Sequence, residues 1–271
     1  MRAEESVDDR TSSRGYMTMP ETLSIERLSV RYGGVVAVDC VTMKVEVGTI
    51  TGLIGPNGAG KTTLMDAVSG FTASSGSVYL NGVRLDGLRP HRRQRLGMAR
   101  TFQSVELFDD LTVGENILVG ESPTIRGVAT EIFTGRQRGL SERSKDLMNQ
   151  FRLWDLQHSK VTTLSQGHRK LVAIVRALTA GPEILLLDEP AAGLDSGESL
   201  WLGEQLKLVR KSGTTLLLVD HDMGLVLSIC DHLFVLDFGS LIAQGPPEVV
   251  RRDPKVMAAY LGDVHEGGTA A

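Results

Sequence analysis

The sequence predicts an α/β fold whose core is a parallel sheet, with an antiparallel β part before it and a helical part inserted in it. Short apolar runs such as EILLLD and TTLLLVD alternate with helical patterns, as in a parallel sheet covered on both faces. Residues 23–54 alternate with a period of two, which is typical of strands. Residues 105–163 instead show helical spacing with few clusters of β-branched residues.

The antiparallel part comes first along the chain. LSIERLSV and VVAVDCVTMKVEV are predicted strands, and GTITGLIG is predicted to be a buried strand that runs into a glycine-rich turn. SVYLNGVRL carries Asn-Gly at its centre, which is the signal for a type I′ hairpin. This part therefore contains antiparallel strands and one strand–loop–helix unit.

We expect one folded domain over residues 22–263, with flexible tails at 1–21 and 264–271. A helical subdomain at about 105–175 is inserted in its core, and FVLDFGSLIAQG predicts a closing hairpin followed by short helices. The predicted apolar helix faces are Leu64, Ala67, Val68 and Phe71 on the first helix, Leu147, Phe151 and Trp154 on the second, and Leu171, Ile174, Val175 and Leu178 on the third.

Composition argues against several classes of protein. The net charge of -4 lacks the basic excess of a general nucleic-acid binder. Cys40 and Cys230 are isolated, so we expect neither a disulfide nor a zinc site and favour a reducing, cytosolic setting. The first twenty residues show no secretory signal, and no apolar run is long enough to span a bilayer. Any role at a membrane is therefore expected to depend on contact with another protein there.

The stretch GPNGAGKT fits the pattern G-x-x-x-x-G-K-[ST] and lies between a predicted strand and a predicted helix. In such a loop, glycines let backbone N–H groups surround phosphate oxygens, and the helix N-terminus adds its positive end. The lysine reaches the β- and γ-phosphates, and the hydroxyl after it binds Mg²⁺. The flanking elements disfavour the alternative, a simple glycine turn with a surface lysine. The predicted nucleotide-binding residues are Gly55, Pro56, Asn57, Gly58, Ala59, Gly60, Lys61, Thr62 and Thr63.

Two apolar strands end in acidic residues. In ILLLDEP, Asp188 is predicted to hold Mg²⁺ and Glu189 to polarise the attacking water as a general base. In LLLVDHDM, His221 is placed to hydrogen-bond a γ-phosphate. The alternatives are an exposed acidic turn for the first pair and a structural role for the histidine.

The stretch LSQGHRK is predicted to begin a helix. Ser165 is a good N-cap, and Gly167 allows close approach of the backbone. A helix N-terminus is a potential anion site, but most serine-capped helices bind no ligand. The residues alone leave both interpretations open.

Taken in order, these motifs resemble the nucleotide-binding subunit of ABC transporters, over about residues 22–263. GPNGAGKT is similar to Walker A, ILLLDE to Walker B with its catalytic glutamate, and AAGLD to the D-loop that ends at Asp195. Gln103 matches the glutamine of the Q-loop, which in the family joins the Mg²⁺ and water site and touches the transmembrane partner. His221 matches the switch histidine. The resemblance implies a P-loop NTPase (RecA-like) core.

Two further segments carry the resemblance. Tyr32 lies where the family stacks an aromatic ring on adenine, although packing within a strand is an alternative. LSQGH occupies the place of the family signature LSGGQ, with Gln166 and His168 as departures. The resemblance implies that Ser165, Gln166 and Gly167 contact the ATP of a partner chain.

The resemblance also implies cofactors and partners. ATP and Mg²⁺ would bind at the interface of a homo- or heterodimer of ABC ATPase subunits. ATP would close the dimer, Glu189 would activate water, and Mg²⁺, Lys61 and His221 would stabilise charge on the transferring phosphoryl group. Transmembrane permease subunits and a separate substrate-binding protein are the implied partners, without nucleic acid. The expected location is peripheral, on the cytoplasmic face of the cell membrane.

Within the family, the ending of the chain is most similar to branched-chain amino-acid importers and their sister systems. The alternative is a soluble ABC-type ATPase without a permease, which usually carries two ATPase halves or a long coiled coil. This chain has one P-loop and no sustained heptads. A P-loop kinase would not explain Glu189 directly after Asp188. The basic run Arg89–Arg95 is interpreted as a solvated face, or else as a contact with permease or lipid headgroups.

Overall fold

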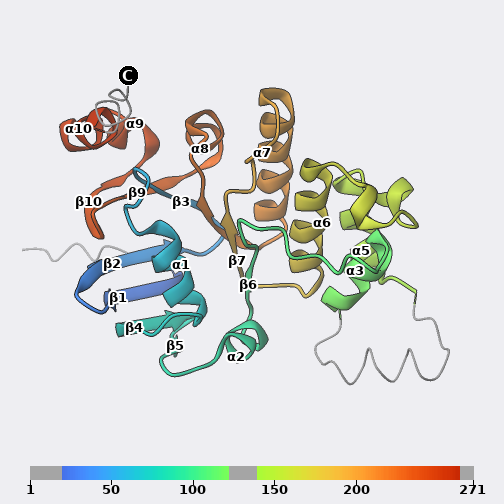
Figure 1. The fold of residues 1–271 in the computed structure, drawn as a ribbon, viewed down its shortest axis with the longest axis horizontal. Helices are drawn as coiled ribbons and strands as arrows, with labels where there is room; N and C mark the ends of the chain where they lie inside the picture. The colour runs from blue at the N-terminus through green and yellow to red at the C-terminus, as the bar shows by residue number, and fades with distance from the viewer. Residues whose placement is uncertain (1–19, 122–138, 263–271) are drawn as a thin grey trace, which may run out of the picture.

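A computed structural model describes residues 20–121 and 139–262, which form two sheets with helices packed around them (Figure 1). The tails predicted at 1–21 and 264–271 lie outside the described residues, except for Pro20 and Glu21.

The first sheet is antiparallel, as its alternating sequence predicts, with the strand order β2-β1-β4-β5. The predicted hairpin is confirmed at β4 and β5. Its turn residues Asn81 and Gly82 have φ angles of 47° and 77°, and a type I′ turn requires positive φ at both positions. The strands are β1 (Glu21–Tyr32), β2 (Val35–Glu46), β4 (Ser75–Leu80) and β5 (Val83–Arg84).

The second sheet has the order β10-β9-β3-β8-β7-β6, and all its neighbours run parallel except the hairpin partners β9 and β10. Because carboxyl ends of parallel strands meet at one edge, the residues that follow β3, β7 and β8 gather there. The strands are β3 (Ile50–Ile54), β6 (Met98–Arg100), β7 (Ile184–Asp188), β8 (Thr215–Val219), β9 (His232–Asp237) and β10 (Ser240–Gly245).

The parallel sheet separates two apolar clusters, because successive residues of a strand face opposite sides. Ile184 and Leu186 of β7 pack with the first helix and the antiparallel sheet, whereas Leu185 and Leu187 pack with three later helices. The helix that begins at the phosphate-loop motif and the helix that begins at LSQGH therefore lie on opposite faces. These helices are α1 (Lys61–Ser69) on one face, and α6 (Gln166–Thr179), α7 (Ser196–Lys211) and α8 (Met223–Ile229) on the other.

Helices occupy the described chain between β6 and β7, on the right of Figure 1. The apolar face predicted for the third helix is confirmed, since Leu171, Ile174, Val175 and Leu178 of α6 are all buried. α3 and α5 pack against α6. The remaining elements here are α3 (Val113–Glu121), α5 (Glu142–Gln150) and the short 3₁₀ turns η1 (Trp154–Leu156) and η2 (Val161–Thr163).

Two predicted helix faces are wrong at their ends. α1 stops at Ser69 because Gly70 adopts the left-handed conformation, with its N–H bonded to the last turn. Phe71 therefore leaves the apolar face and is 56% exposed. α5 stops before Phe151, and Trp154 lies in the separate turn η1. The predicted packing of this face is nevertheless confirmed, because Phe151 is fully buried and Leu147 and Trp154 pack against the same core.

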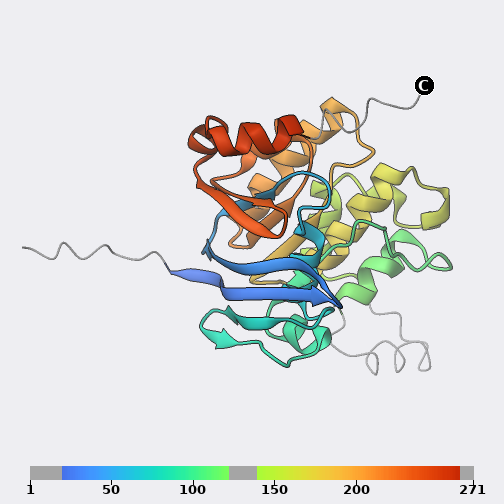
Figure 2. The same cartoon turned by 60° about the vertical axis from the view of Figure 1, so that its left-hand side comes forward.

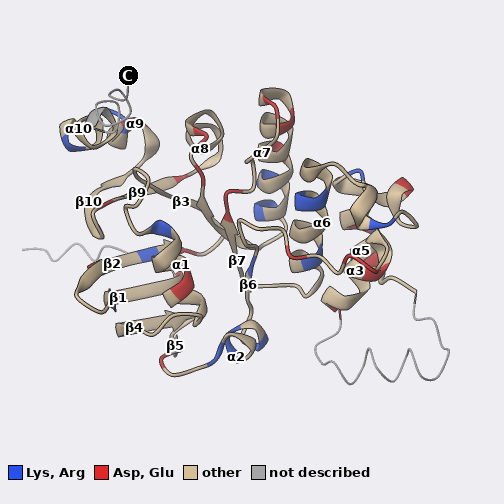
Figure 3. Ribbon diagram, viewed as in Figure 1, with Lys and Arg blue, Asp and Glu red and all other residues tan. Residues whose placement is uncertain are grey.

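The basic run forms α2 (Pro90–Arg95), which is labelled in Figure 3 and carries blue segments there. Arg93 is not solvated as predicted, because it is only 6% exposed. Its Nη1 donates to Ala67 O at 3.0 Å and to Val68 O at 2.6 Å. Arg93 thus adds a side-chain donor to carbonyls in the last turn of α1, where the regular hydrogen bonds of the helix end. The neighbouring Arg89, Arg92 and Arg95 are exposed.

Two short helices close the described chain and pack on the β9–β10 pair (Figure 2). They are α9 (Pro247–Val250) and α10 (Pro254–Gly262). Within residues 20–121 and 139–262, no helix is both long enough and apolar enough to cross a membrane. Cys40 and Cys230 are both free, as expected.

Candidate nucleotide site

The loop between β3 and α1 depends on its glycines. Gly55, Gly58 and Gly60 have φ angles of 149°, 77° and 98°, in the range that favours glycine. A Cβ at Gly55 would overlap the carbonyl oxygen of Leu236, and one at Gly60 would overlap that of Ala37. Gly60 is also the N-cap of α1 and offers no side chain to its first N–H groups. The loop and the helix N-terminus together can surround an anion.

Two side chains at the start of α1 and one at the end of β1 complete the predicted nucleotide site. Lys61 folds back over the loop, where Nζ donates to Gly55 O at 2.7 Å and to Pro56 O at 2.8 Å. Thr62 is exposed on the first turn of α1. Tyr32 is 52% exposed at the end of β1, with its hydroxyl 3.3 Å from Thr72 Oγ1. Its ring therefore lies at the protein surface.

Asp188 ends β7 and is only 3% exposed. Arg100 donates through Nη2 to Asp188 Oδ2 at 3.1 Å, and through Nη1 to Asp66 Oδ1 at 2.6 Å and Ser69 Oγ at 2.8 Å. Burial raises the pKa of Asp188, and the charge of Arg100 opposes that shift. Asp188 Oδ1 is buried and has no hydrogen-bond partner among the described residues. One carboxylate oxygen is thus fixed, and the other is left for a donor or a cation.

The described residues contain no cluster of three or more His, Cys, Asp or Glu side chains that could cage a metal ion. Mg²⁺ does not require such a cage, because it keeps several waters and takes one or two carboxylates together with substrate phosphates. Asp188 Oδ1 and the hydroxyl of Thr62, which follows the loop between β3 and α1, fit a Mg²⁺ site that is completed by water and substrate phosphates.

Arg100→Met is expected to lower the free energy of unfolding by about 3–5 kcal/mol, because it leaves the buried Asp188 without its cationic partner. Urea unfolding measures this change. Arg92→Met, which alters an exposed arginine on α2, is the matched control and should stay within about 0.5 kcal/mol. The double variant Arg100→Met/Asp188→Asn should lose less than the sum of the single variants, and strict additivity would contradict the coupling.

Glu189 follows Asp188 with a left-handed φ of 47°. Its N–H donates to Val219 O at 2.7 Å, and its Oε2 accepts from Gln103 Nε2 at 2.8 Å. His221 Nδ1 lies 3.9 Å from the same Oε2. The structure thus brings together the predicted residues Gln103, Glu189 and His221 from three separate segments. The Glu189 side chain is 23% exposed.

The turn that carries His221 is fixed by two aspartates. Asp220 is buried and accepts from Asp222 N at 2.9 Å and Ala191 N at 3.1 Å, and burial raises its pKa. Asp222 caps α8 and accepts from Ser199 Oγ at 2.6 Å, a hydrogen bond that lowers the pKa of Asp222. The imidazole of His221 remains 67% exposed. It can therefore reach a bound group beside Glu189.

Ser165 is the N-cap of α6, as predicted. Its hydroxyl accepts from His168 N at 3.3 Å and lies 2.8 Å from His168 Nδ1. A Cβ at Gly167 would lie 2.6 Å from Leu194 Cδ2, so Gly167 permits the AAGLD segment to approach α6. Gln166 is exposed. The predicted start of a serine-capped helix is thus confirmed.

Asp195, at the end of AAGLD, is the N-cap of α7. It forms a capping box with Glu198: Asp195 Oδ1 accepts from Glu198 N at 2.8 Å, and Glu198 Oε2 accepts from Asp195 N at 3.1 Å. The carboxylate therefore has a structural partner within its own chain.

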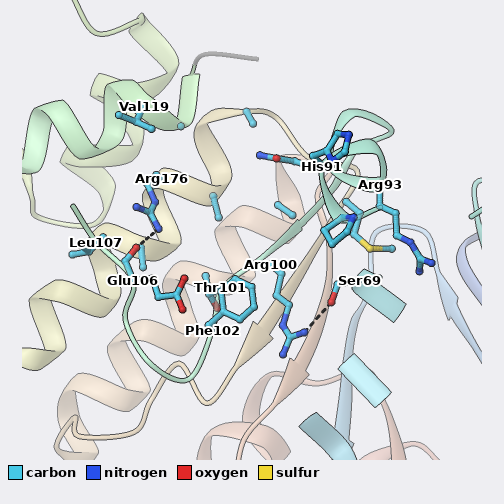
Figure 4. A pocket seen from close by; sticks show the side chains of 18 of the residues that line it. Ser69, His91, Arg93, Arg100, Thr101, Phe102, Glu106, Leu107, Val119 and Arg176 are labelled. Carbon is cyan, nitrogen blue, oxygen red and sulfur yellow. Dashed lines mark hydrogen bonds between the residues drawn. The ribbon is translucent and has the colours of Figure 1, made fainter. Parts of the chain in front are cut away.

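A groove of about 580 Å³ lies beside this site, between α2, α3 and α6 (Figure 4). The ring of Phe102, next to Gln103, meets Phe71 edge-on at 5.2 Å and lies 4.8 Å from the guanidinium of Arg100. Arg176 donates to Glu106 O on the groove wall. Arg100 thus lines the groove and also holds Asp188.

At this site the sequence alone assigned no role to two cations, Arg100 and Lys170, whose side chains are buried. Lys170 is 7% exposed, and its Nζ donates to Glu189 O at 2.7 Å. A signal was present for Lys170, because it lies one turn before Ile174 on the apolar stripe of α6. A charged residue on the apolar face of a helix is unusual, and its position there indicates a buried partner. Arg100 had no comparable signal.

Two sequence families match the chain. The family described as ABC transporter matches residues 38–192, and the family described as branched-chain amino acid ATP-binding cassette transporter matches residues 240–266.

Known proteins are similar over nearly the whole chain. The high-affinity branched-chain amino acid transport ATP-binding protein BraF of Pseudomonas aeruginosa is 38% identical, covering 89% of this chain and 98% of that protein. LivG of Escherichia coli, described in the same words, is 37% identical with the same coverage. A solved nucleotide-free ATP-binding cassette from an ABC transporter superposes with a TM-score of 0.79 at 31% identity, covering 89% of this chain and 98% of that one.

Proposed function

The chain belongs to the ABC transporter family as an ATP-hydrolysing subunit that powers an importer, and we propose that the imported cargo is a branched-chain or related amino acid. The C-terminal family match and the names of the relatives support this cargo. The observation that carries the proposed chemistry is the cluster at the end of β7, where Gln103 and His221 meet the carboxylate of Glu189.

In the proposed reaction, the P-loop N–H groups and Lys61 bind the β- and γ-phosphates, and the ring of Tyr32 stacks on adenine. Glu189 takes a proton from water as the water oxygen attacks the γ-phosphorus and the bond to ADP breaks. His221 hydrogen-bonds a γ-phosphate oxygen. The products are ADP and inorganic phosphate.

We propose that Asp188, Thr62 and Gln103 hold Mg²⁺, either directly or through water. The orphaned Asp188 Oδ1 supports this assignment. When bound, Mg²⁺ supplies charge neutralisation on the β- and γ-phosphate oxygens.

The proposed ATPase works as a dimer, with a second subunit that is either identical to this chain or a different ABC ATPase. α1 and α6 pack on opposite faces of the parallel sheet, so the P-loop and Ser165 belong to helices on opposite faces. We propose that Ser165, Gln166 and Gly167 contact ATP bound to the partner chain, with the Asp195 segment beside them. ATP then closes the dimer and hydrolysis reopens it.

We propose that the permease docks in the groove beside Gln103, on the cytoplasmic face of the membrane. The groove adjoins the catalytic cluster, and its wall residue Arg100 reaches Asp188, so an occupant could affect the ATPase site. A separate substrate-binding protein would deliver the amino acid to the permease. The alternative, an ATPase without a permease, gives no role to this groove.

Ala180→Trp tests this assembly, because it places a large ring in the groove from an exposed position at the end of α6. The tagged chain is purified from detergent-solubilised membranes, and its permease subunits are quantified. We expect the wild-type chain to retain permease subunits and to hydrolyse ATP faster when leucine-loaded binding protein is added. Ala180→Trp should lose the permease subunits, whereas Leu208→Trp, on the exposed surface of α7, should retain them. Equal retention by both variants would contradict docking in the groove.

A further inference from the structure

Lys170 is a buried cation that the proposed reaction leaves without a role. It lies five residues beyond Ser165, which is about 7.5 Å along the axis of α6. Burial lowers the pKa of Lys170, while the charges of Asp220, Glu189 and Asp188 oppose that shift. Burying an ammonium group is costly unless it has partners. Its hydrogen bond of 2.7 Å to the carbonyl of Glu189 is therefore a specific contact between α6 and the end of β7.

The backbone of Glu189 needs support from its surroundings. A non-glycine residue at a φ of 47° is strained by about 1–3 kcal/mol and persists only when neighbouring groups hold it. The N–H of Glu189 is held by Val219 O at 2.7 Å, and its side chain by Gln103 at 2.8 Å. Lys170 holds the remaining backbone group, the carbonyl, by the shorter of its two hydrogen bonds, since the carbonyl also accepts from Ala192 N at 3.3 Å.

α6 can transmit a displacement from its N-terminus to this contact. Ser165 caps the helix, and Leu171, Val172 and Ile174 anchor the following turns in the core. The first turns are therefore one packed segment, so a shift at Ser165 also shifts Lys170 relative to Glu189.

We propose that Lys170 is a positioning residue that couples the signature end of α6 to Glu189 of the same chain. This inference rests on the proposed function, in which Ser165 contacts ATP bound to a second chain. When α6 engages that ATP, Lys170 sets the carbonyl of Glu189 and with it the direction of the carboxylate. When the dimer closes on ATP bound to the partner chain, Glu189 of this chain is thus brought into its catalytic position. Each ATP site of the dimer therefore affects hydrolysis at the other.

The test replaces Lys170 in the full-length chain and measures kcat, KM for ATP, nucleotide affinity and melting temperature. Lys170→Met removes the donor and should lower kcat about 100-fold, as expected for a misplaced catalytic group. The shorter Lys170→Gln should lower kcat about tenfold, and Lys170→Arg should remain within about threefold of the wild-type chain. Nucleotide affinity of the single chain should stay within about twofold, because the P-loop is unchanged.

Arg169→Met is the matched control, because it removes a neighbouring cation of α6 that pairs with Asp109 at 2.9 Å. Its kcat should stay within about twofold of the wild-type value. The proposal is overturned if Lys170→Met retains wild-type kcat, or if Arg169→Met loses as much. If Lys170→Met does not fold, the kcat of Lys170→Gln is the deciding measurement. A wild-type kcat in that variant overturns the proposal.

Failure of this inference can be distinguished from failure of the proposed function. If Glu189→Gln forms no ATP-bound dimer, the proposed function itself fails. If that dimer forms but the Lys170 variants turn over normally, only the coupling through Lys170 is wrong.

Discussion

Glu189→Gln is expected to bind ATP like the wild-type chain, to lose about 10³-fold in turnover, and to accumulate as an ATP-bound dimer. The amide is nearly isosteric with the carboxylate and can still accept from Gln103, but it cannot take a proton from water. Binding and closure should therefore survive, while hydrolysis stops. Phosphate release measures turnover, and size exclusion with ATP measures the dimer.

Glu183→Gln is the matched control, since the same chemical change is made at an exposed glutamate just before β7. Its turnover should stay within about twofold of the wild-type value. A Glu189→Gln chain that hydrolyses ATP normally and remains monomeric would contradict the assignment of the general base.

Ser165→Arg is expected to abolish dimer formation and turnover, while the single chain still binds nucleotide. The substitution puts a long cation where the partner's γ-phosphate should bind. It also removes the cap on His168 N, which costs about 1 kcal/mol of helix stability. Turnover, size exclusion with ATP and the nucleotide affinity of the monomer check the three parts of this expectation.

A matched control separates the loss of a cap from the loss of a phosphate contact. Ser141 caps α5 by accepting from Ser144 N at 3.2 Å, so Ser141→Arg removes a similar cap in the helical part. That variant should be destabilised to a similar extent yet still hydrolyse ATP. Loss of nucleotide binding by the Ser165→Arg monomer would instead mean that the signature serves its own P-loop.

Local patterns explain what the sequence could predict. The P-loop, the two acids at the end of β7 and the cap at Ser165 each depend on a few consecutive residues, whose spacing determines the conformation. The Asn81–Gly82 turn was predictable for the same reason. The end of α1 was predicted wrongly, because the left-handed Gly70 competes with continuation of the helix toward Phe71.

The contacts that were not predicted join distant segments. Arg100 meets Asp188 across 88 positions, and Lys170 meets Glu189 across 19. Nothing local distinguishes Arg100 from a surface cation, and the position of Lys170 on the apolar stripe of α6 indicates burial but not its partner. Tertiary packing alone gives both cations their partners.

The contact between Gly167 and Leu194 indicates how freely the signature can vary. Gln166 is exposed, so this chain can carry a long side chain where glycine is usual in the family without disturbing its own packing. Position 167 has less freedom, because a Cβ there would lie 2.6 Å from Leu194 Cδ2 and the Leu194 side chain would have to move. Within the LSQGH stretch, the fold of the chain itself thus constrains Gly167 more than Gln166, and the exposed position 166 is left open to adjustment toward a particular partner subunit.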